Sequence, residues 1–337
     1  MNIKEFSALA GVSTATVSRV FARNSSVAGK TRERILELAQ RHGFRPNQVA
    51  KASFGGKTKS VGVLLCRLTN SYFANIAIGV QKVMLAEDYL PIIIDLREDG
   101  TRAGIKRLVD HRVDGIIVSI SDRSLTPTEI GEIVRFKLPV VTVDGNWLDG
   151  AYDNVCSDDY RGGYLAGKFL VENGHRNIVF CGHTISSATA YRRVEGFRDA
   201  LSEGGVPFSK NNIIEIQSSA VNQVITDLKL AHRLKKSDFT AAYCYNDDDA
   251  LTLYRIVQSV GMTVPEDFSI IGHADLDFAT VMSPALTTIR QDGIAIGKRA
   301  ATMMLDRLKS VDCGPRLESQ NVELIVRESV ANIKTEK

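Results

Sequence analysis

The stretch that decides how this chain is organised lies at its start, in residues 3–22. It reads Ile3-Lys4-Glu5-Phe6-Ser7-Ala8-Leu9-Ala10-Gly11-Val12-Ser13-Thr14-Ala15-Thr16-Val17-Ser18-Arg19-Val20-Phe21-Ala22. The first half has apolar residues at helical spacing, namely Phe6, Leu9 and Ala10. Gly11 suits a turn with positive φ, and Ser13 can cap a second helix through its side-chain oxygen.

The second half of the stretch predicts a helix with one apolar and one polar face. Its inward stripe is Val17, Val20 and Phe21, and its outward residues are Thr14, Ala15, Ser18 and Arg19. Two short helices around a tight glycine turn indicate a helix-turn-helix, whose second helix fits the major groove of DNA. The alternative is a small helical hairpin without a ligand.

Charge is distributed unevenly along the chain. Residues 1–60 carry a net charge of +8, whereas the whole chain carries only +3, so residues 61–337 carry −5. A basic segment ahead of an acidic body is typical of a polyanion-binding module joined to another domain. The charge therefore favours DNA binding by the first domain.

The rest of the N-terminal segment predicts one more helix and a linker. The helix is expected from Lys30 to about His42, with Ile35, Leu38 and Ala39 on its inner face. Residues 48–60 have the composition of a linker, which can be partly helical over residues 48–53.

After Val61 the pattern changes to short apolar strands that alternate with amphipathic helices. Strands are expected at Val61–Cys66, Pro91–Leu96, Gly115–Ile120, Pro139–Val143, Asn177–Cys181, Ile213–Ile216, Ala241–Tyr245 and Ser269–Ile271. Helices fit at Ala74–Ala86, Arg161–Asn173, Val194–Glu203 and Asp248–Val260. Strands that are apolar on both faces predict parallel sheets covered by helices, and such folds bind ligands beyond the carboxyl ends of their strands.

Several classes of protein fit the sequence poorly. No apolar run approaches the ~18 residues of a membrane span, and the N-terminus has no apolar signal segment. The five cysteines (66, 156, 181, 244 and 313) are scattered, which indicates reduced core residues in a cytoplasmic protein. We find no metal-ligand cluster and expect no metal or cofactor. An enzyme lacks support because there is no Walker loop, no G-x-G-x-x-G after a strand, no G-x-S-x-G and no catalytic carboxylate pair. A solute-binding protein is disfavoured by the basic N-terminal domain and the missing signal segment.

The chain resembles the LacI/GalR family of bacterial transcription regulators over nearly its whole length. The motifs that carry the resemblance occur in the family's order: Gly11-Val12-Ser13-x-x-Thr16-Val17-Ser18-Arg19-Val20, Gly43-Phe44-Arg45-Pro46-Asn47, Arg112-Val113-Asp114-Gly115-Ile116-Ile117-Val118, Gly174-His175-Arg176-x-Ile178, Arg193-x-x-Gly196-Phe197, Val264-Pro265-Glu266-Asp267-Phe268-Ser269-Ile270-Ile271-Gly272 and Leu286-Thr287-Thr288-Ile289-Arg290-Gln291-Asp292.

This resemblance implies a small all-α helix-turn-helix headpiece (1–46), a hinge (47–60) and an α/β two-lobed core with parallel sheets, like the periplasmic binding proteins (61–337). One lobe would comprise 61–158 and 291–319, and the other 159–290 and 320–337. The resemblance also implies a homodimer that binds a near-palindromic operator. Residues 331–337 are too few and too polar for the coiled-coil seam of a tetramer, so a dimer is expected.

The resemblance also assigns roles in DNA binding. Base contacts are expected from Thr14, Ala15 and Arg19, with the Arg19 guanidinium forking onto a guanine. Phosphate contacts are expected from Ser13, Thr16, Ser18, Asn24 and Asn47. The hinge departs from the family pattern, because Ser53 stands where a leucine usually wedges into the minor groove. Phe54 is the nearest apolar residue, and it either serves as the wedge or packs against protein. We expect a milder DNA bend unless Phe54 inserts.

An effector pocket between the lobes is implied in the same way, with contacts from Tyr72, Phe73, Asp144, Arg193, Asn246 and Asp275. Ala274 stands where the family often has a sugar-binding aspartate. We interpret Asp247-Asp248-Asp249 as a solvated helix start, favoured by the helix dipole, and not as a metal site.

The expected function is that of a repressor of a carbohydrate uptake or catabolism operon, with a neutral sugar as effector and no membrane association. The alternatives are a catabolic activator or a corepressor-dependent regulator that responds to a sugar acid or to a nucleobase or nucleoside. The residues leave open whether the ligand is an inducer or a corepressor. An effector that prefers one angle between the lobes would change how the headpieces fit the operator, and this coupling must be reciprocal.

Overall fold

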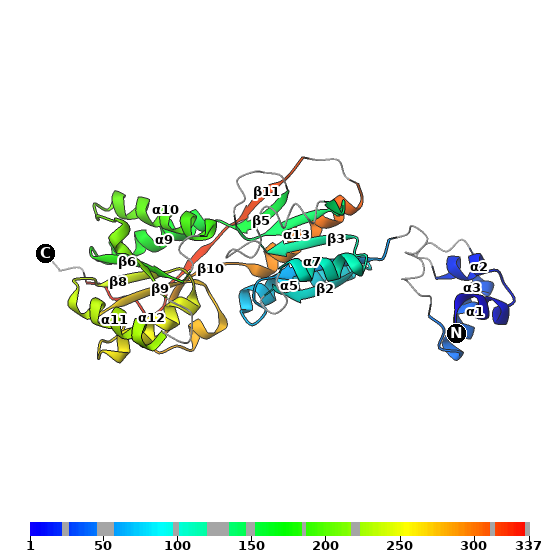
Figure 1. The fold of residues 1–337 in the computed structure, drawn as a ribbon, viewed down its shortest axis with the longest axis horizontal. Coiled ribbons are helices and arrows are strands. Elements are labelled where there is room, and N and C mark those ends of the chain that lie inside the picture. The colour runs from blue at the N-terminus through cyan, green and yellow to red at the C-terminus, as the bar shows by residue number, and fades with distance from the viewer. Residues whose placement is uncertain are drawn as a thin grey trace. The chain divides into compact units, whose positions relative to one another are not determined.

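The structure, a computed structural model, has two compact units, Met1–Lys59 and Ser60–Lys337 (Figure 1). It describes residues 1–21, 27–45, 57–96, 101–119, 135–145, 152–183, 187–216, 223–310 and 314–333. We refer to the first unit as the headpiece and to the second as the core.

The headpiece contains the helices α1 (Ile3–Ala10), α2 (Thr14–Val20) and α3 (Gly29–Arg41). Gly11 ends α1 with a φ of 64°, and the Ser13 hydroxyl accepts a hydrogen bond from the Thr16 amide at 3.1 Å to cap α2. The core of the headpiece consists of buried side chains from all three helices and the segment after α3, namely Phe6, Ala10, Val17, Val20, Ile35, Ala39 and Phe44.

Of the three apolar residues at helical spacing in α1, Phe6 and Ala10 are buried and Leu9 is 50% exposed. Phe44, after α3, packs against this buried face, and its ring stacks on Phe6 with the ring centroids 4.0 Å apart.

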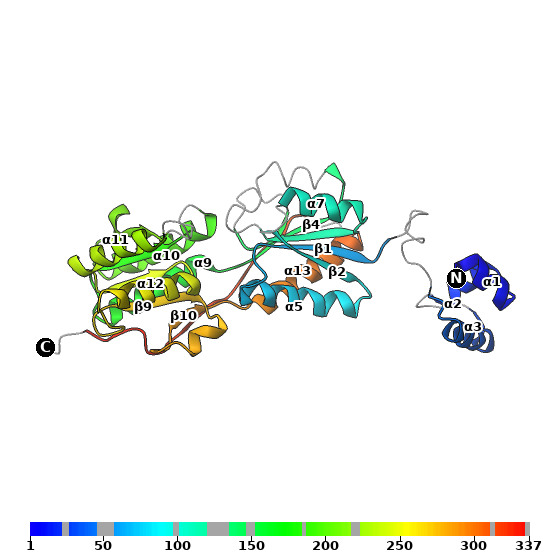
Figure 2. The same cartoon turned by 60° about the horizontal axis from the view of Figure 1, so that its bottom comes forward.

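The first lobe of the core is built on a six-stranded sheet in the order β11-β5-β4-β3-β1-β2, in which all strand pairs are parallel. Its strands are β1 (Ser60–Leu65), β2 (Leu90–Asp95), β3 (Gly115–Ser119), β4 (Val140–Val143), β5 (Asp153–Ser157) and β11 (Leu317–Gln320). Helices α5 (Ser71–Ala86) and α13 (Gly293–Leu308) cover one face of this sheet, and α7 (Thr101–Asp110) covers the other (Figure 2).

The second lobe repeats this plan with the sheet order β12-β10-β9-β8-β6-β7. Its strands are β6 (Ile178–Gly182), β7 (Ile213–Glu215), β8 (Ala241–Cys244), β9 (Ser269–Ala274), β10 (Thr287–Arg290) and β12 (Glu323–Ile325). Helices α9 (Asp159–Glu172) and α10 (Ala188–Glu203) cover one face, and α11 (Gln223–Lys236) and α12 (Asp247–Ser259) the other (Figure 1). Only β12 runs antiparallel to its neighbour. Short 3₁₀ turns lie at Lys210–Asn212 (η1) and Asp277–Thr280 (η2).

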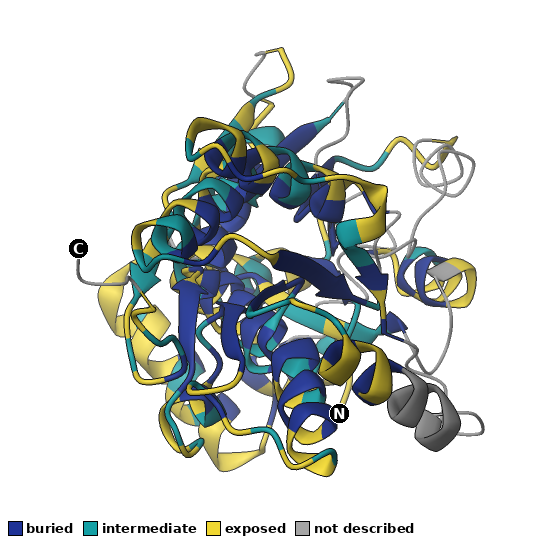
Figure 3. Ribbon diagram, turned by 90° about the vertical axis from the view of Figure 1, so that its left-hand side faces the viewer, coloured by how far each residue is buried: buried dark blue, intermediate teal, exposed yellow. Residues whose placement is uncertain are grey.

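The alternation of buried side chains explains how helices cover both faces of each sheet. Along β1, the side chains of Val61, Val63 and Leu65 join the apolar cluster under α5 and α13, whereas Leu64 joins the cluster under α7. The buried strands therefore form the centre of the core, with exposed residues gathered on the outer sides of the helices (Figure 3). Among the described residues, no helix is both long and apolar enough to cross a membrane.

The strands that the sequence reading missed are polar or short. β5 has the buried polar residues Asp153, Asn154 and Ser157, and β11 is half exposed at the edge of its sheet. The elements that were expected differ from the observed ones mainly at their ends, most clearly at α10, which begins six residues before the expected Val194.

Candidate DNA interface and ligand pocket

The outward face of α2 carries the three residues expected to read bases. Thr14, Ala15 and Arg19 are all exposed, while Val17 and Val20 on the opposite face are buried. The sequence therefore places three side chains of different chemistry on one accessible helical surface, as a recognition helix requires.

The residues expected to contact phosphates are only partly described. The Ser13 and Thr16 hydroxyls lie 2.9 Å apart at the start of α2, and Ser18 is half-buried. Asn24, Asn47, Ser53 and Phe54 lie outside the described residues, and the expected contacts of these four therefore remain predictions.

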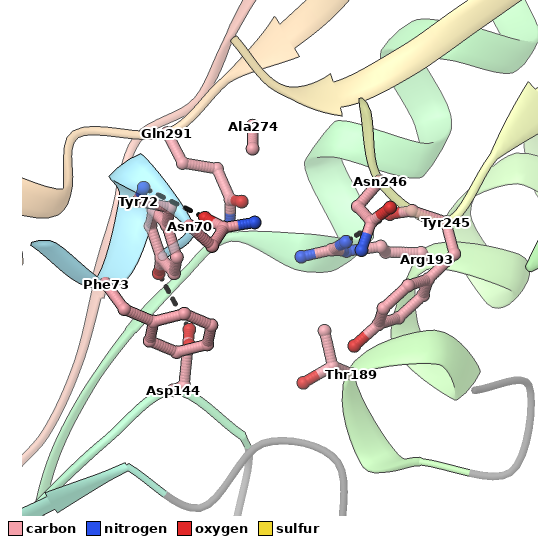
Figure 4. Close-up of a pocket in the computed structure, with 10 residues that line it drawn as sticks. All are labelled: Asn70, Tyr72, Phe73, Asp144, Thr189, Arg193, Tyr245, Asn246, Ala274 and Gln291. Atoms are coloured by element: carbon pink, nitrogen blue, oxygen red, sulfur yellow. Dashed lines mark hydrogen bonds between the residues drawn. The ribbon is translucent and has the colours of Figure 1, made fainter. Parts of the chain in front are cut away.

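A pocket in the core is formed where strands of both sheets end (Figure 4). It is lined by Asn70, Tyr72, Phe73, Asp144, Thr189, Arg193, Tyr245, Asn246, Ala274 and Gln291. Asp144 follows β4, Asn246 follows β8, Ala274 ends β9 and Gln291 follows β10. This is the location that parallel α/β sheets provide for ligands, because the carboxyl ends of their strands share one edge.

One wall of the pocket is an aromatic pair held by a carboxylate. The Tyr72 hydroxyl donates to Asp144 at 2.7 Å, and the Tyr72 and Phe73 rings meet edge to face with centroids 5.3 Å apart. Burial, together with the charge of Asp144, raises the pKa of Tyr72 well above its usual value. Tyr72 therefore stays a neutral donor to the Asp144 carboxylate.

The opposite wall contains a buried cation that is already paired. Nε of Arg193 donates to the Asp159 carboxylate at 2.8 Å, an amino group of Arg193 donates to the carbonyl of Tyr245, and the guanidinium lies 4.8 Å from the centre of the Tyr245 ring. Burial opposes the charge of Arg193, but the nearby Asp159 raises the pKa of the guanidinium above its usual value. Burial raises the pKa of Asp159, and Arg193 opposes part of that rise. The short contact holds both groups in their charged forms, so the pair adds little net charge to the pocket.

Two lining residues that the sequence reading missed carry unsatisfied polar atoms. Oγ1 of Thr189 and Nε2 of Gln291 are buried and have no hydrogen-bond partner among the described residues. A buried polar atom without a partner costs free energy, so these two atoms mark where a ligand gains hydrogen bonds. Thr189 precedes Arg193 by four residues on α10, and this spacing places both on one helical face and could have revealed Thr189.

The two asparagines of the pocket cap the helices that follow them. The Asn70 side chain accepts a hydrogen bond from the Tyr72 amide at 2.9 Å, and the Asn246 side chain accepts one from the Asp249 amide at 2.8 Å. Because the oxygen of Asn246 is engaged in this way, its amide group is the part that can donate to a ligand.

Asp275, which was expected to contact the effector, is not among the residues that line the pocket. Its carboxylate is held by Arg290 and Arg327, at 2.7 and 2.6 Å. Ala274 lines the pocket instead, with a φ of 130°, and Asp275 has a φ of 57°. The two ion pairs therefore engage the Asp275 carboxylate within the protein.

The run Asp247-Asp248-Asp249 is not the solvated helix start that its composition indicates. Asp247 is fully buried and accepts hydrogen bonds from the Thr288 hydroxyl at 2.6 Å and the Leu276 amide at 2.7 Å. Asp249 is buried against His183, whose Nδ1 lies 2.8 Å from a carboxylate oxygen. Burial raises the pKa of Asp247 to about 6. These carboxylates join α12 to neighbouring strand ends and support the pocket from behind.

A helix-turn-helix headpiece and a two-lobed core with a pocket define a ligand-responsive DNA-binding protein, and comparisons with known proteins agree. Residues 2–47 match the family "Bacterial regulatory proteins, lacI family", and residues 168–330 match a "Periplasmic binding protein-like domain". A protein of Vibrio vulnificus, "HTH-type transcriptional repressor PurR", is 31% identical over 335 residues, which cover 98% of this chain and 99% of that protein.

Solved structures give the same fold. A LacI family transcriptional regulator of Enterococcus faecium with bound ribose has a TM-score of 0.71 at 28% identity, covering 82% of this chain and 100% of that one. The lac repressor dimer bound to operator and the anti-inducer ONPF has a TM-score of 0.83 at 22% identity, covering 98% and 99%. The chain belongs to the LacI family of bacterial regulatory proteins. It is a ligand-responsive DNA-binding repressor and not an enzyme.

Proposed function

We propose that the chain represses a carbohydrate uptake or catabolism operon and that a small neutral sugar occupies the pocket. The observation that carries this proposal is the charge balance of the pocket. Arg193 is neutralised by Asp159, and Asp144 adds a carboxylate on the facing wall. A neutral ligand with several hydroxyl groups can both donate to Asp144 and accept from Thr189 and Gln291.

The charge balance of the pocket disfavours a sugar acid, which the sequence allowed as an alternative effector. Arg192, the second arginine of the pair at 192–193, is not a lining residue, because it pairs with Glu195 and lies 5.3 Å from the centre of the Tyr160 ring. An acidic ligand would therefore meet the Asp144 carboxylate while Arg193, the cation on the facing wall, is already paired with Asp159.

A nucleobase or nucleoside is the second candidate. The aromatic side chains Tyr72, Phe73 and Tyr245 support it, as do the relatives named PurR. Calorimetry on the full chain distinguishes the candidates with D-ribose, D-glucose, D-gluconate, hypoxanthine and adenosine as probes. We expect a neutral sugar to bind and D-gluconate not to bind. Binding of hypoxanthine or adenosine alone would replace the sugar by the second candidate.

Two conservative substitutions test whether the ligand binds in this pocket. Thr189→Val and Gln291→Leu each remove one unsatisfied polar atom and nearly preserve side-chain size, so the fold should remain intact. Each should weaken binding of the sugar about ten-fold, since the ligand loses one hydrogen bond. Unchanged affinity in both variants would remove the sugar from this pocket.

We assign base reading to Thr14, Ala15 and Arg19 on the exposed face of α2. The positive net charge of the headpiece supports this assignment, because phosphate neutralisation provides much of the affinity of such domains. Two headpieces would read the two halves of a near-palindromic operator, as in the regulators that the chain resembles.

A homodimer is supported by exposed apolar side chains on one part of the core. Ile78 and Leu85 of α5 and Leu90 and Ile93 of β2 are 39–60% exposed on two elements that contact each other. A second copy of the chain would cover them. Leu85→Glu should convert dimer to monomer in light scattering, while Leu317→Glu, on the opposite edge strand β11, should not. A monomeric wild-type chain would contradict the assignment.

A further inference from the structure

An aspartate of the second lobe is bound by two residues of the first lobe. Oδ2 of Asp248, at the start of α12, accepts hydrogen bonds from the Arg67 guanidinium and, at 2.9 Å, from Nδ2 of Asn70. Arg67 and Asn70 lie between β1 and α5 of the first lobe. These contacts therefore cross from one sheet unit to the other beside the pocket.

The donors on the first lobe are fixed in place. The Leu68 amide donates to Asp95 at the end of β2 at 2.9 Å, and the Asn70 amide donates to the Arg67 carbonyl at 3.1 Å. Asn70 also caps α5 through its side-chain oxygen, which leaves its amide group directed at Asp248. The loop 67–70 is thus held in place by hydrogen bonds within the first lobe.

The acceptor lies in an electropositive position. Asp248 is the second residue of α12, where the amide dipoles favour a negative charge, and Asn70 is the residue that caps α5. The Arg67 cation adds to these two helix ends. The Asp248 carboxylate therefore lies close to the start of α12, the cap of α5 and the Arg67 guanidinium.

The network is connected to the pocket without filling it. Asn70 lines the pocket, whereas Arg67 and Asp248 are not among its lining residues and keep 34% and 36% of their side chains exposed. Asp248 is also flanked by Asn246, which lines the pocket from the second lobe. Moving one lobe away from the other would break both hydrogen bonds of Asp248 and separate Asn70 from Asn246.

We propose that Arg67, Asn70 and Asp248 form an inter-lobe latch that holds the pocket walls at their binding distance before a ligand arrives. Arg67 and Asp248 are positioning residues, because they act on the ligand only through the lobes. The latch lowers the dissociation rate of the ligand, since release requires the lobes to part. This role rests on the proposed function of the pocket as an effector site, but the latch itself is measurable without ligand.

Hydrogen exchange of the full chain without ligand tests the latch across the lobes. Arg67→Gln should speed exchange at the first turn of α12, where the Ala250 amide bonds to the Asn246 carbonyl, although the substitution is in the other lobe. Asp248→Asn should likewise speed exchange at the first turn of α5, where the Ala74 amide bonds to the Asn70 carbonyl. Arg67→Lys retains the charge and should restore most of the protection. The double variant Arg67→Gln/Asp248→Asn should exchange no faster than either single variant, because both substitutions break the same contact.

Asp110→Asn is the matched control. It breaks the exposed ion pair between Asp110 and Lys106, which are 2.7 Å apart within α7. Hydrogen exchange at the first turns of α5 and α12 should stay unchanged. Exchange confined to the mutated lobe, or equal to that of the control, would overturn the latch.

Calorimetry with D-ribose then separates the latch from the ligand assignment. If wild type binds D-ribose, Arg67→Gln and Asp248→Asn should each weaken binding about five-fold, the effect of one partly exposed ion pair. The change should appear as faster dissociation in stopped-flow measurements. If wild type does not bind D-ribose, that sugar is excluded as the effector, while the cross-lobe exchange still decides whether the latch exists.

Discussion

The DNA-reading face of the headpiece and the pocket of the core hold their polar side chains in different ways. Thr14, Ala15 and Arg19 are exposed on α2, whereas Tyr72 and Arg193 are buried and bonded to carboxylates. The recognition face can therefore adjust its rotamers to bases and phosphates. The pocket is arranged in advance and pays little conformational entropy on binding. Removing a bonded pocket residue such as Arg193 should consequently affect both the ligand and the fold, and a mutation on the recognition face should affect DNA alone.

The largest effect is expected at Arg193. Arg193→Ala leaves the buried Asp159 without its partner and should lower the free energy of unfolding of the core by about 3–5 kcal/mol, with loss of ligand binding. Thermal unfolding and calorimetry measure the two effects. Arg192→Ala is the matched control, since its side chain is partly exposed and pairs with Glu195 on the same helix; it should change both by little. Equal effects of the two substitutions would contradict the description of the pocket wall.

Arg19 should show the opposite profile. Arg19→Ala should cost on the order of 1–3 kcal/mol per base contact and relax the preference for one base pair per half-site. Core stability and ligand affinity should stay unchanged. Competition between operator variants in a fluorescence anisotropy assay measures the specificity. An equal loss on operator and random DNA would identify Arg19 as a phosphate contact.

Acid should weaken the core through Asp153 of β5, whose carboxylate is bound by Arg307 and Arg316. Burial favours the protonated form, but the two arginines lower the pKa of Asp153 to about 2. Its contribution, about 2 kcal/mol, is therefore complete above the unfolded pKa near 3.8 and disappears as the pH falls towards 2. Denaturant unfolding of wild type should show this decline, and Asp153→Asn should be less stable at pH 7 with a shallower decline. An identical pH profile for Asp153→Asn would remove Asp153 from this role.

The smallest effect is expected at Leu9. Leu9→Ala should change the stability of the headpiece by less than about 0.5 kcal/mol, because the side chain is half exposed. Phe6→Ala, at a fully buried position on the same helix, should cost about 3–5 kcal/mol. Unfolding followed by circular dichroism, compared between each variant and wild type, tests both predictions. A large loss in Leu9→Ala would mean that α1 packs differently from the structure.

The headpiece could be predicted almost completely because its determinants are local. The φ of Gly11, the Ser13 cap and the buried face of α2 all arise within residues 11–20. Leu9 is exposed although it shares the helical spacing of Phe6 and Ala10, because helical spacing defines a stripe of apolar residues but not its width. The contacts that fix the edge of the stripe come from Phe44, which lies far along the sequence.

The pocket could be predicted only in part because residues from distant strand ends assemble it. Tyr72, Phe73, Asp144, Arg193 and Asn246 were identified, and all five line it. Thr189 and Gln291 were missed, since an unsatisfied buried atom exists only in three dimensions. The burial of Asp247 and Asp249 was not predicted, because partners such as Thr288 are distant in sequence, and the same is true of Arg327, which binds Asp275. Composition alone predicts that a run of three aspartates is solvated, and only the contacts show that Asp247 and Asp249 are buried.

The most direct test of the account joins the headpiece to the core in one measurement. Fluorescence anisotropy of the full chain on DNA from upstream of its own gene would be recorded with and without saturating sugar, D-ribose first. The account predicts that the sugar changes the Kd for operator by at least about five-fold and that operator changes the Kd for the sugar by the same factor. A sugar that binds the pocket, as Thr189→Val and Gln291→Leu would verify, but leaves the Kd for operator unchanged would contradict the account.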